Sequence, residues 1–177
     1  MYIVIQKKLL KHLEYLQVFD DDKNLLDEKV ERSNKLNLKD GKRFMIVLVF
    51  IENSEHKFLV QKTSKERNSE YAITGGHVTY KDTSLKTVIK ELKEELGVII
   101  NESQINYFDT IKYPKAYADL YYIKKDLNIN KLNIQKEEVD SIIWLSKDEI
   151  IELINKNEFR KSNIEPLNKF FEYIKNR

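Results

Sequence analysis

Residues 76–98 read GHVTYKDTSLKTVIKELKEELGV, a stretch in which a glycine-led loop runs into a strongly periodic segment. At roughly 100° per residue the apolar side chains of this segment fall on one stripe, which predicts a helix packed on a core. The stripe consists of Leu85, Val88, Ile89, Leu92 and Leu96. Asp82 or Thr83 can cap the start of the helix, and Gly97 can end it in the left-handed conformation.

Three glutamates lie together on a different face of this helix. Glu91, Glu94 and Glu95 stand at i, i+3 and i+4, a spacing that stacks their side chains on one surface. The lysines of the helix gather on the other flank, whereas an ordinary solvated helix more often mixes the two signs. Like charges this close repel, so we expect a counter-cation. Carboxylates are hard oxygen ligands that suit Mg²⁺ or Mn²⁺.

The same residues resemble the Nudix box, in which Gly, five residues, Glu, seven residues, Arg-Glu, an aliphatic residue, any residue, Glu-Glu, any residue, Gly and an aliphatic residue follow one another. The matching positions here are Gly76, Asp82, Lys90, Glu91, Leu92, Glu94, Glu95, Gly97 and Val98. The departures are Asp82, which replaces Glu, and Lys90, which replaces Arg. The resemblance implies an α/β fold of the Nudix type, an α/β/α sandwich with a mixed β-sheet.

The resemblance also implies a catalytic site that hydrolyses a diphosphate. Its metal ligands would be Glu91, Glu94 and Glu95, with a backbone carbonyl of the Gly75-Gly76 pair. These glycines permit close backbone approach because neither has a side chain. Glu91 and Glu94 are therefore candidate catalytic residues. The general base would be Glu94 or a later glutamate, for which we select Glu138 with Glu137 behind it, although these two acids can equally begin a strand from a solvated loop.

The two departures concern the support of the site. Asp82 is shorter than Glu, and Lys90 offers a point charge where Arg offers a planar fork. We expect the Asp82 and Lys90 pair to brace the metal-binding carboxylates more loosely than in the family, and Gly97 to complete that support by ending the helix.

Cations and a histidine near the glycine pair are candidates for holding the substrate. His77 follows the pair directly, and Lys62 and Arg67 precede it, so all three can bind phosphate. A solvent-facing histidine and a soluble basic loop are the alternatives. The middle of the chain is aromatic, and we expect most of these rings in the core, with one or two lining the pocket. They are Tyr107, Phe108, Tyr113, Tyr117, Tyr121 and Tyr122.

Composition fits a catalytic domain of ordinary size. The chain has 177 residues, a net charge of +2 with 34% charged residues, and no cysteine. The mixed surface shows no overall basic bias toward nucleic acid. The apolar run Tyr2 to Ile5 is too short for a signal peptide, and no window is long enough to span a membrane, so we expect a cytoplasmic enzyme. Residues 1–177 read as a single Nudix domain, and the sequence is compatible with a homodimer.

The expected elements follow the order of such a domain. We expect a helix and a hairpin within residues 1–40, the helix over residues 4–14 and the hairpin strands at Tyr15 to Phe19 and Lys23 to Val30. Five further strands are expected at residues 43–51, 57–61, 107–111, 116–124 and 139–145. Two helices, residues 147–155 and 164–174, close the chain by about residue 175.

The opening of the chain also resembles the Nudix branch that includes isopentenyl-diphosphate isomerase, through Glu14 to Asp20, Arg32 and Gly41. That isomerase uses a catalytic cysteine, which this chain lacks. We therefore expect a Mg²⁺-dependent pyrophosphohydrolase for a small-molecule substrate, a nucleoside diphosphate linked to another moiety. A non-catalytic Nudix-like module that senses a nucleotide or metabolite, and an RNA-end hydrolase, remain alternatives.

Overall fold

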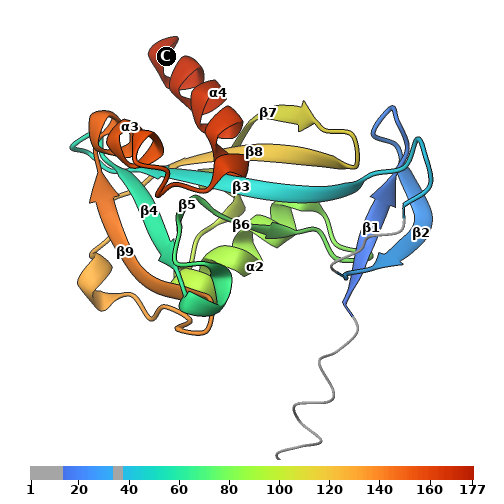
Figure 1. Ribbon diagram of the computed structural model, residues 1–177, viewed down its shortest axis with the longest axis horizontal. Coiled ribbons are helices and arrows are strands. Elements are labelled where there is room, and N and C mark those ends of the chain that lie inside the picture. The colour runs from blue at the N-terminus through green and yellow to red at the C-terminus, as the bar shows by residue number, and fades with distance from the viewer. Residues whose placement is uncertain (1–13, 34–37) are drawn as a thin grey trace, which may run out of the picture.

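The computed structural model describes residues 14–33 and 38–177 (Figure 1). Two strands, β1 (Tyr15–Phe19) and β2 (Leu25–Glu31), form a small antiparallel sheet. Within the described residues a larger sheet has seven strands: β3 (Phe44–Glu52), β4 (Phe58–Thr63), β5 (Tyr71–Ala72), β6 (Thr74–His77), β7 (Asn106–Lys112), β8 (Ala116–Lys124) and β9 (Val139–Leu145). The helices are α2 (Ser84–Leu96), α3 (Lys147–Asn155) and α4 (Ile164–Lys175). These elements agree with the expected ones to within two residues at most ends, and the expected helix over residues 4–14 lies outside the described residues.

Strand β3 is the centre of the larger sheet. It runs parallel to β8 along its whole length and antiparallel to β6 over the four residues Ile46–Val49, and it meets β4 where Glu52 pairs with Phe58. Strands β7 and β9 add antiparallel partners to β8 and β4. The sheet is therefore mixed, as expected.

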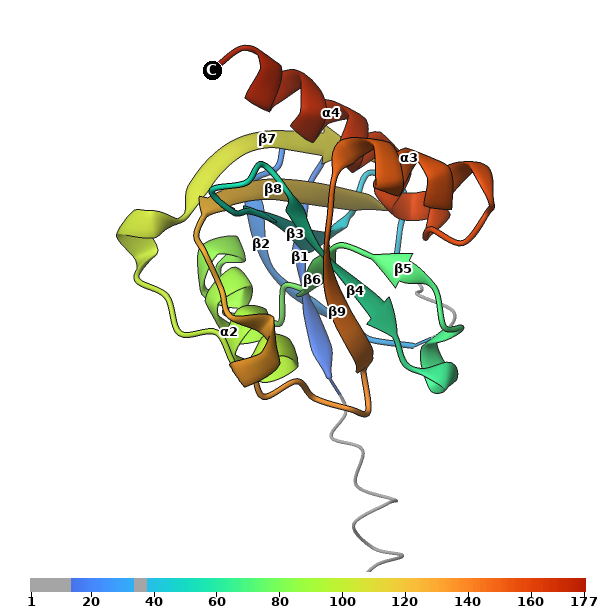
Figure 2. The same ribbon diagram turned by 90° about the vertical axis from the view of Figure 1, so that its left-hand side faces the viewer.

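Helices cover both faces of the sheet, with α2 on one side and α3 and α4 on the other (Figures 1 and 2). Successive side chains of a strand point to opposite faces. Val47 and Val49 of β3 accordingly join the core under α2, while Leu48 and Phe50 join the core under α3 and α4. The α/β/α sandwich expected from the resemblance is confirmed.

Helix α2 forms as its sequence pattern predicts. Val88, Leu92 and Leu96 are fully buried. The Thr83 side chain caps the first turn by accepting from the backbone N–H of Lys86 at 3.2 Å. Gly97 ends the helix at φ 68°, a left-handed conformation that a residue with a Cβ adopts only with strain. The direction of α2, and with it the placement of its acidic face, is thus set at both ends.

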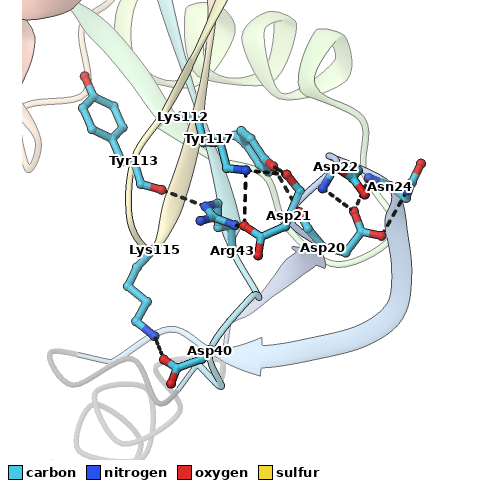
Figure 3. A network of polar contacts seen from close by, with 10 residues as sticks. All are labelled: Asp20, Asp21, Asp22, Asn24, Asp40, Arg43, Lys112, Tyr113, Lys115 and Tyr117. Carbon is cyan, nitrogen blue, oxygen red and sulfur yellow. Dashed lines mark hydrogen bonds and ion pairs between the residues drawn. The ribbon is translucent and has the colours of Figure 1, made fainter.

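A polar network ties the β1–β2 hairpin to the larger sheet (Figure 3). The Asp21 carboxylate pairs with Arg43, at the start of β3, and with Lys112 of β7 at 3.3 Å. The Tyr117 hydroxyl donates to the backbone oxygen of Asp21 at 2.6 Å. The chain turns at Asp21 and Asp22, between the two expected strands of the hairpin, and these contacts anchor that turn to the larger sheet.

The aromatic residues of the middle segment behave differently from expectation in one respect. Tyr117 and Tyr121 are buried in the core under α2, and Tyr122 is buried in the opposite core, as the alternation along β8 predicts. The expectation that one or two of the six rings line the pocket is wrong, because none of them lines the cavity described below. Phe108 and Tyr113 pack against the core under α3 and α4, and Tyr107 is exposed. None of the helices in the described ranges is long and apolar enough to cross a membrane.

Candidate active site

A cavity of about 460 Å³ opens between the acidic face of α2, the start of β3, β6 and the connecting segments that carry Arg67, Glu138 and Arg160. Most residues singled out from the sequence line it. These are Arg67, Gly75, Gly76, His77, Lys90, Glu91, Glu94, Glu95 and Glu138. The fold therefore brings together the glycine pair, the three helix glutamates, the later glutamate and two of the three candidate phosphate-binding residues.

The contact between Gly76 and Glu91 explains why glycine occupies this position of β6. A Cβ at residue 76 would lie 1.9 Å from Oε1 of Glu91, well inside any van der Waals contact. Antiparallel pairing of β6 with β3 fixes Gly76 opposite Val47, so the strand cannot move away. The missing side chain thus leaves room for the Glu91 carboxylate at the backbone of β6.

Glu91 and Glu95 are acids in an unfavourable environment for charge. Burial raises the pKa of Glu91 to about 7, and the charge of Glu138 adds to the effect. Burial raises the pKa of Glu95 to about 8, with the charges of Glu91 and Glu138 as further causes. Glu94 is exposed at the mouth of the cavity. Two acids whose pKa values are raised by burial and by neighbouring acids favour a bound cation when ionised.

Glu95 also has an oxygen with no partner. Its Oε2 is buried and accepts no hydrogen bond, and it is the one such side-chain atom in the part of the chain that the structure describes. A buried carboxylate oxygen of this kind costs free energy unless a donor or a cation approaches it. The donor set therefore fits a hard cation that binds through oxygen.

The carboxylates do not form a complete metal cage by themselves. Across residues 14–33 and 38–177, no group of three or more His, Asp or Glu side chains is arranged closely enough to hold a metal ion. Mg²⁺ does not require such a group, because it keeps several waters and is bound by one or two carboxylates together with substrate phosphates. Glu91 and Glu95 supply such a pair beside an open cavity.

Two loops that carry opposite charges are fastened to each other beside these acids. Arg67 lies in the 3-10 turn η1 (Lys65–Arg67), and its Nη2 pairs with Oε2 of Glu138 at 2.7 Å. Ser64 joins the two loops, donating its backbone N–H to the oxygen of Glu138 at 2.9 Å and its hydroxyl to the oxygen of Glu137 at 2.8 Å. Glu137 is exposed, so Glu138 alone of this pair faces the cavity.

The segment between α3 and α4 closes the cavity on the same side. Its backbone runs beside β5: the Arg160 N–H donates to the oxygen of Tyr71 at 2.8 Å, and the Tyr71 N–H donates to the oxygen of Glu158 at 2.9 Å. Asn163 is buried and accepts from the backbone N–H of Ile73 at 2.9 Å. Arg160 and Asn163 both line the cavity.

His77 is a half-buried strand residue of the site. Its ring stacks on Phe44 with centroids 5.4 Å apart, and both residues line the cavity. Burial lowers the pKa of His77 to about 4, and the charge of Arg32 acts in the same direction. The alternative of a solvent-facing histidine is thus excluded, and the ring is neutral at neutral pH, able to donate through one nitrogen and accept through the other.

Two expectations, one about phosphate binding and one about the support of the site, differ from the structure. Lys62 does not line the cavity, because β4 directs its ammonium over the Tyr71 ring, 5.1 Å from the centroid. Asp82 and Lys90 form no ion pair in the described ranges. Asp82 instead accepts from the Thr79 hydroxyl at 2.6 Å, in the turn before α2, while Lys90 lines the cavity.

Several lining residues were missed by sequence reasoning. Arg160 and Asn163 lie in a connecting segment with no motif, and their contacts span about ninety residues of chain. Gln135 stands three residues before Glu138, so its place in the cavity could have been predicted from its closeness to this acidic segment. Arg32, which carries part of the resemblance to the isomerase branch but is not among the predicted site residues, lines the cavity and pairs with Glu14.

Comparisons with known proteins agree with this geometry. The family model of the NUDIX domain matches residues 42–167. A relative from Listeria monocytogenes, described as an uncharacterized Nudix hydrolase, is 27% identical over 145 residues, which is 77% of this chain and 86% of the relative. A second, from Nostoc, is 26% identical over 171 residues, or 92% of this chain and 98% of the relative.

Solved structures share the fold. Protein DR0079 of Deinococcus radiodurans superposes with a TM-score of 0.71 at 18% identity, covering 87% of this chain and 96% of that one. An Ap4A hydrolase of C. elegans gives a TM-score of 0.56 at 17% identity, covering 75% of this chain and 99% of that one. The family model spans most of the chain and includes the whole α2 segment with its three glutamates, so the chain belongs to the Nudix family and is a Nudix hydrolase.

Proposed function

We propose that the protein is a Mg²⁺-dependent pyrophosphohydrolase that cleaves a nucleoside diphosphate linked to another moiety, releasing a nucleotide and a phosphorylated product. The observation that carries the proposal is the buried Oε2 of Glu95, which has no hydrogen-bond partner and belongs to a residue that lines the cavity together with Glu91 and Glu138. A cation bound beside such an oxygen would stabilise it and would supply positive charge for the diphosphate.

In this proposal Glu91 and Glu95 would hold the metal ion together with the backbone at Gly75 and Gly76, and Glu94 at the cavity mouth would turn toward the ion as a third ligand once it is bound. When bound, the ion would neutralise negative charge on the diphosphate and on the departing phosphate. Mn²⁺ fits the same hard oxygen ligands. Lys90 lies close enough to oppose the rise in the pKa of Glu91, and so stabilises the ionised form in the absence of a bracing arginine.

The residues of the chain position the water and manage its proton. Glu138, or Glu94 at the cavity mouth, accepts a proton from the attacking water. The water oxygen forms a bond to one phosphorus while the bridging P–O bond breaks, and the leaving phosphate takes the electron pair of that bond. Arg67 and neutral His77 hold phosphate oxygens or the neighbouring part of the substrate as hydrogen-bond donors.

A substrate panel tests the proposal. Purified protein with Mg²⁺ is incubated with nucleoside diphosphate sugars, dinucleoside polyphosphates and nucleoside triphosphates, and the products are identified by phosphorus NMR. We expect turnover of at least one class, reduced about 100-fold or more in Glu94→Gln or Glu95→Gln, since carboxylates at such sites act through charge. Lys86→Gln, on the opposite flank of α2, is the control and should retain the wild-type rate. Nucleotide binding without turnover in any class would contradict the enzyme and favour a sensor.

A further inference from the structure

The cavity has two chemically different walls. Glutamates of α2 form one wall, and the other wall carries two arginines, Arg67 on η1 and Arg160 in the 3-10 turn region between α3 and α4. Resting on the proposed hydrolase function, we infer that Arg67 and Arg160 form a clamp for a terminal phosphate. The moiety attached to the nucleoside diphosphate then ends in a phosphate group, as in a nucleoside triphosphate, and is not a neutral sugar.

Arg67 is held toward the cavity by its loop. The turn that carries it is fixed to the Glu138 loop through Ser64, and the next two residues, Asn68 and Ser69, both have positive φ, at 75° and 54°. These left-handed residues turn the chain back toward β5 immediately after the arginine. The side chain is 39% exposed, so a ligand in the cavity can reach it.

Arg160 reaches the same cavity from a distant part of the sequence. Backbone hydrogen bonds on both sides of Tyr71 fix its main chain to β5. Its guanidinium makes a single ion pair in the described part of the chain, from Nε to Oε2 of Glu70 at 3.4 Å, and is 31% exposed. This long contact leaves most of the donor capacity of the guanidinium, which has five N–H groups, for another acceptor.

In the free protein each arginine forms an ion pair with a carboxylate that a phosphate can displace. The pairs with Glu138 and Glu70 are partly exposed, and ion pairs of this kind contribute little to stability. A terminal phosphate carries close to two negative charges at neutral pH and accepts the paired N–H groups of a guanidinium in a planar, bidentate geometry. A sugar at this position offers neither the charge nor that geometry.

The clamp also connects substrate binding to the general base. In the free protein Glu138 forms an ion pair with Arg67. When the terminal phosphate takes Arg67, the Glu138 carboxylate loses its ion-pair partner and is free to turn toward the substrate. Arg67 therefore acts on the reaction twice, as a phosphate ligand and through Glu138.

The test compares two substrates that share the nucleoside diphosphate and differ in the attached group, uridine triphosphate and uridine diphosphate glucose. For the wild type we expect kcat/KM to be about 10-fold or more higher for the triphosphate. Arg67→Gln and Arg160→Gln should each lower kcat/KM for the triphosphate about 10- to 100-fold, the range expected for losing a charge-assisted hydrogen bond. Each variant should lose markedly less kcat/KM with the sugar substrate than with the triphosphate. For Arg160→Gln the loss should appear in KM, and for Arg67→Gln in KM and kcat, because only Arg67 contacts Glu138.

Matched controls are Lys65→Gln on η1 and Lys161→Gln beside Arg160, two exposed lysines that do not line the cavity. Thermal unfolding of every variant separates loss of fold from loss of the clamp. Arg160→Lys keeps the charge without the planar fork, so its kcat/KM for the triphosphate should fall between those of the wild type and Arg160→Gln.

Equal losses on both substrates, or a preference of the wild type for the sugar, would overturn the clamp while leaving the hydrolase intact. If no substrate is turned over, calorimetric binding of a non-hydrolysable methylene triphosphate analogue decides the clamp separately: affinity that does not depend on Arg67 and Arg160 rejects it.

Discussion

At the scale of single residues, the site depends on the lack of a side chain at Gly76. Gly76 leaves the space that the Glu91 carboxylate occupies, and Glu95 keeps a buried oxygen without a partner beside it. The glycine and the glutamates were recognisable from their spacing alone. The contact between Gly76 and Glu91 could not be predicted from the sequence. It depends on the register of β6 against β3, which places Gly76 of β6 beside Glu91 of α2.

Gly76→Ala should separate stability from activity. The new methyl group meets the flexible end of Glu91, which can swing aside, so we expect a loss of less than about 1 kcal/mol in the free energy of unfolding. The displaced carboxylate can no longer hold its place in the cavity, so activity should fall about 10-fold or more. Urea unfolding and initial rates measure the two effects. A variant with full activity would show that Glu91 does not need its place against this glycine, and a strongly destabilised variant would show that the carboxylate cannot swing aside.

His77 gives the apoprotein a pH dependence with a definite sign. Its pKa is lowered from 6.5 in the unfolded chain to about 4 in the fold, because burial disfavours the charged ring. The stability contributed by the neutral ring is complete above pH 6.5 and is lost as pH falls through 4, by about 3 kcal/mol in total. Urea unfolding between pH 7 and 4 should therefore show a smaller decline in His77→Gln than in the wild type. Parallel declines would mean that His77 titrates normally.

At the scale of elements, α2 is the part that the sequence defined best. Its stripe, its cap at Thr83 and its end at Gly97 all agree with the structure, because they depend on contacts within a few residues. The expected pairing of Asp82 with Lys90 is not found in the described residues, also for a local reason. In the turn before α2 the Asp82 carboxylate accepts a hydrogen bond from the Thr79 hydroxyl at 2.6 Å. The arginine wall could not be predicted, since Arg160 reaches the cavity through pairing with β5.

Ser64 offers a test of how the two charged loops are joined. In Ser64→Ala the hydroxyl contact to the Glu137 oxygen at 2.8 Å is lost, while the backbone contact to Glu138 remains. We expect a loss of about 1 kcal/mol in the free energy of unfolding, as for an ordinary buried hydrogen bond, and a severalfold drop in kcat because Glu138 is held less firmly. Ser103→Ala, at an exposed serine, is the control. A kcat equal to that of the control would show that this fastening does not position Glu138.

At the scale of the whole molecule, two cores on opposite faces of one mixed sheet hold the site between them. Strand β3 alternates its side chains between these cores and presents its first residues to the cavity. The order of strands and helices was predictable because runs of apolar residues mark most of them. The six aromatic residues of the middle segment were partly misjudged, since composition alone does not tell which rings face a core and which face a pocket.

The most direct measurement of the central claim is the rate of hydrolysis as a function of Mg²⁺ concentration, for the wild type and for Glu95→Gln at pH 7.5 with one substrate from the panel. The account predicts that EDTA abolishes the wild-type rate, that Mg²⁺ restores it in a saturable manner, and that Glu95→Gln needs far more Mg²⁺ and reaches a much lower maximum. A wild-type rate that is unchanged by EDTA, or a Glu95→Gln variant with the same Mg²⁺ dependence as the wild type, would contradict it.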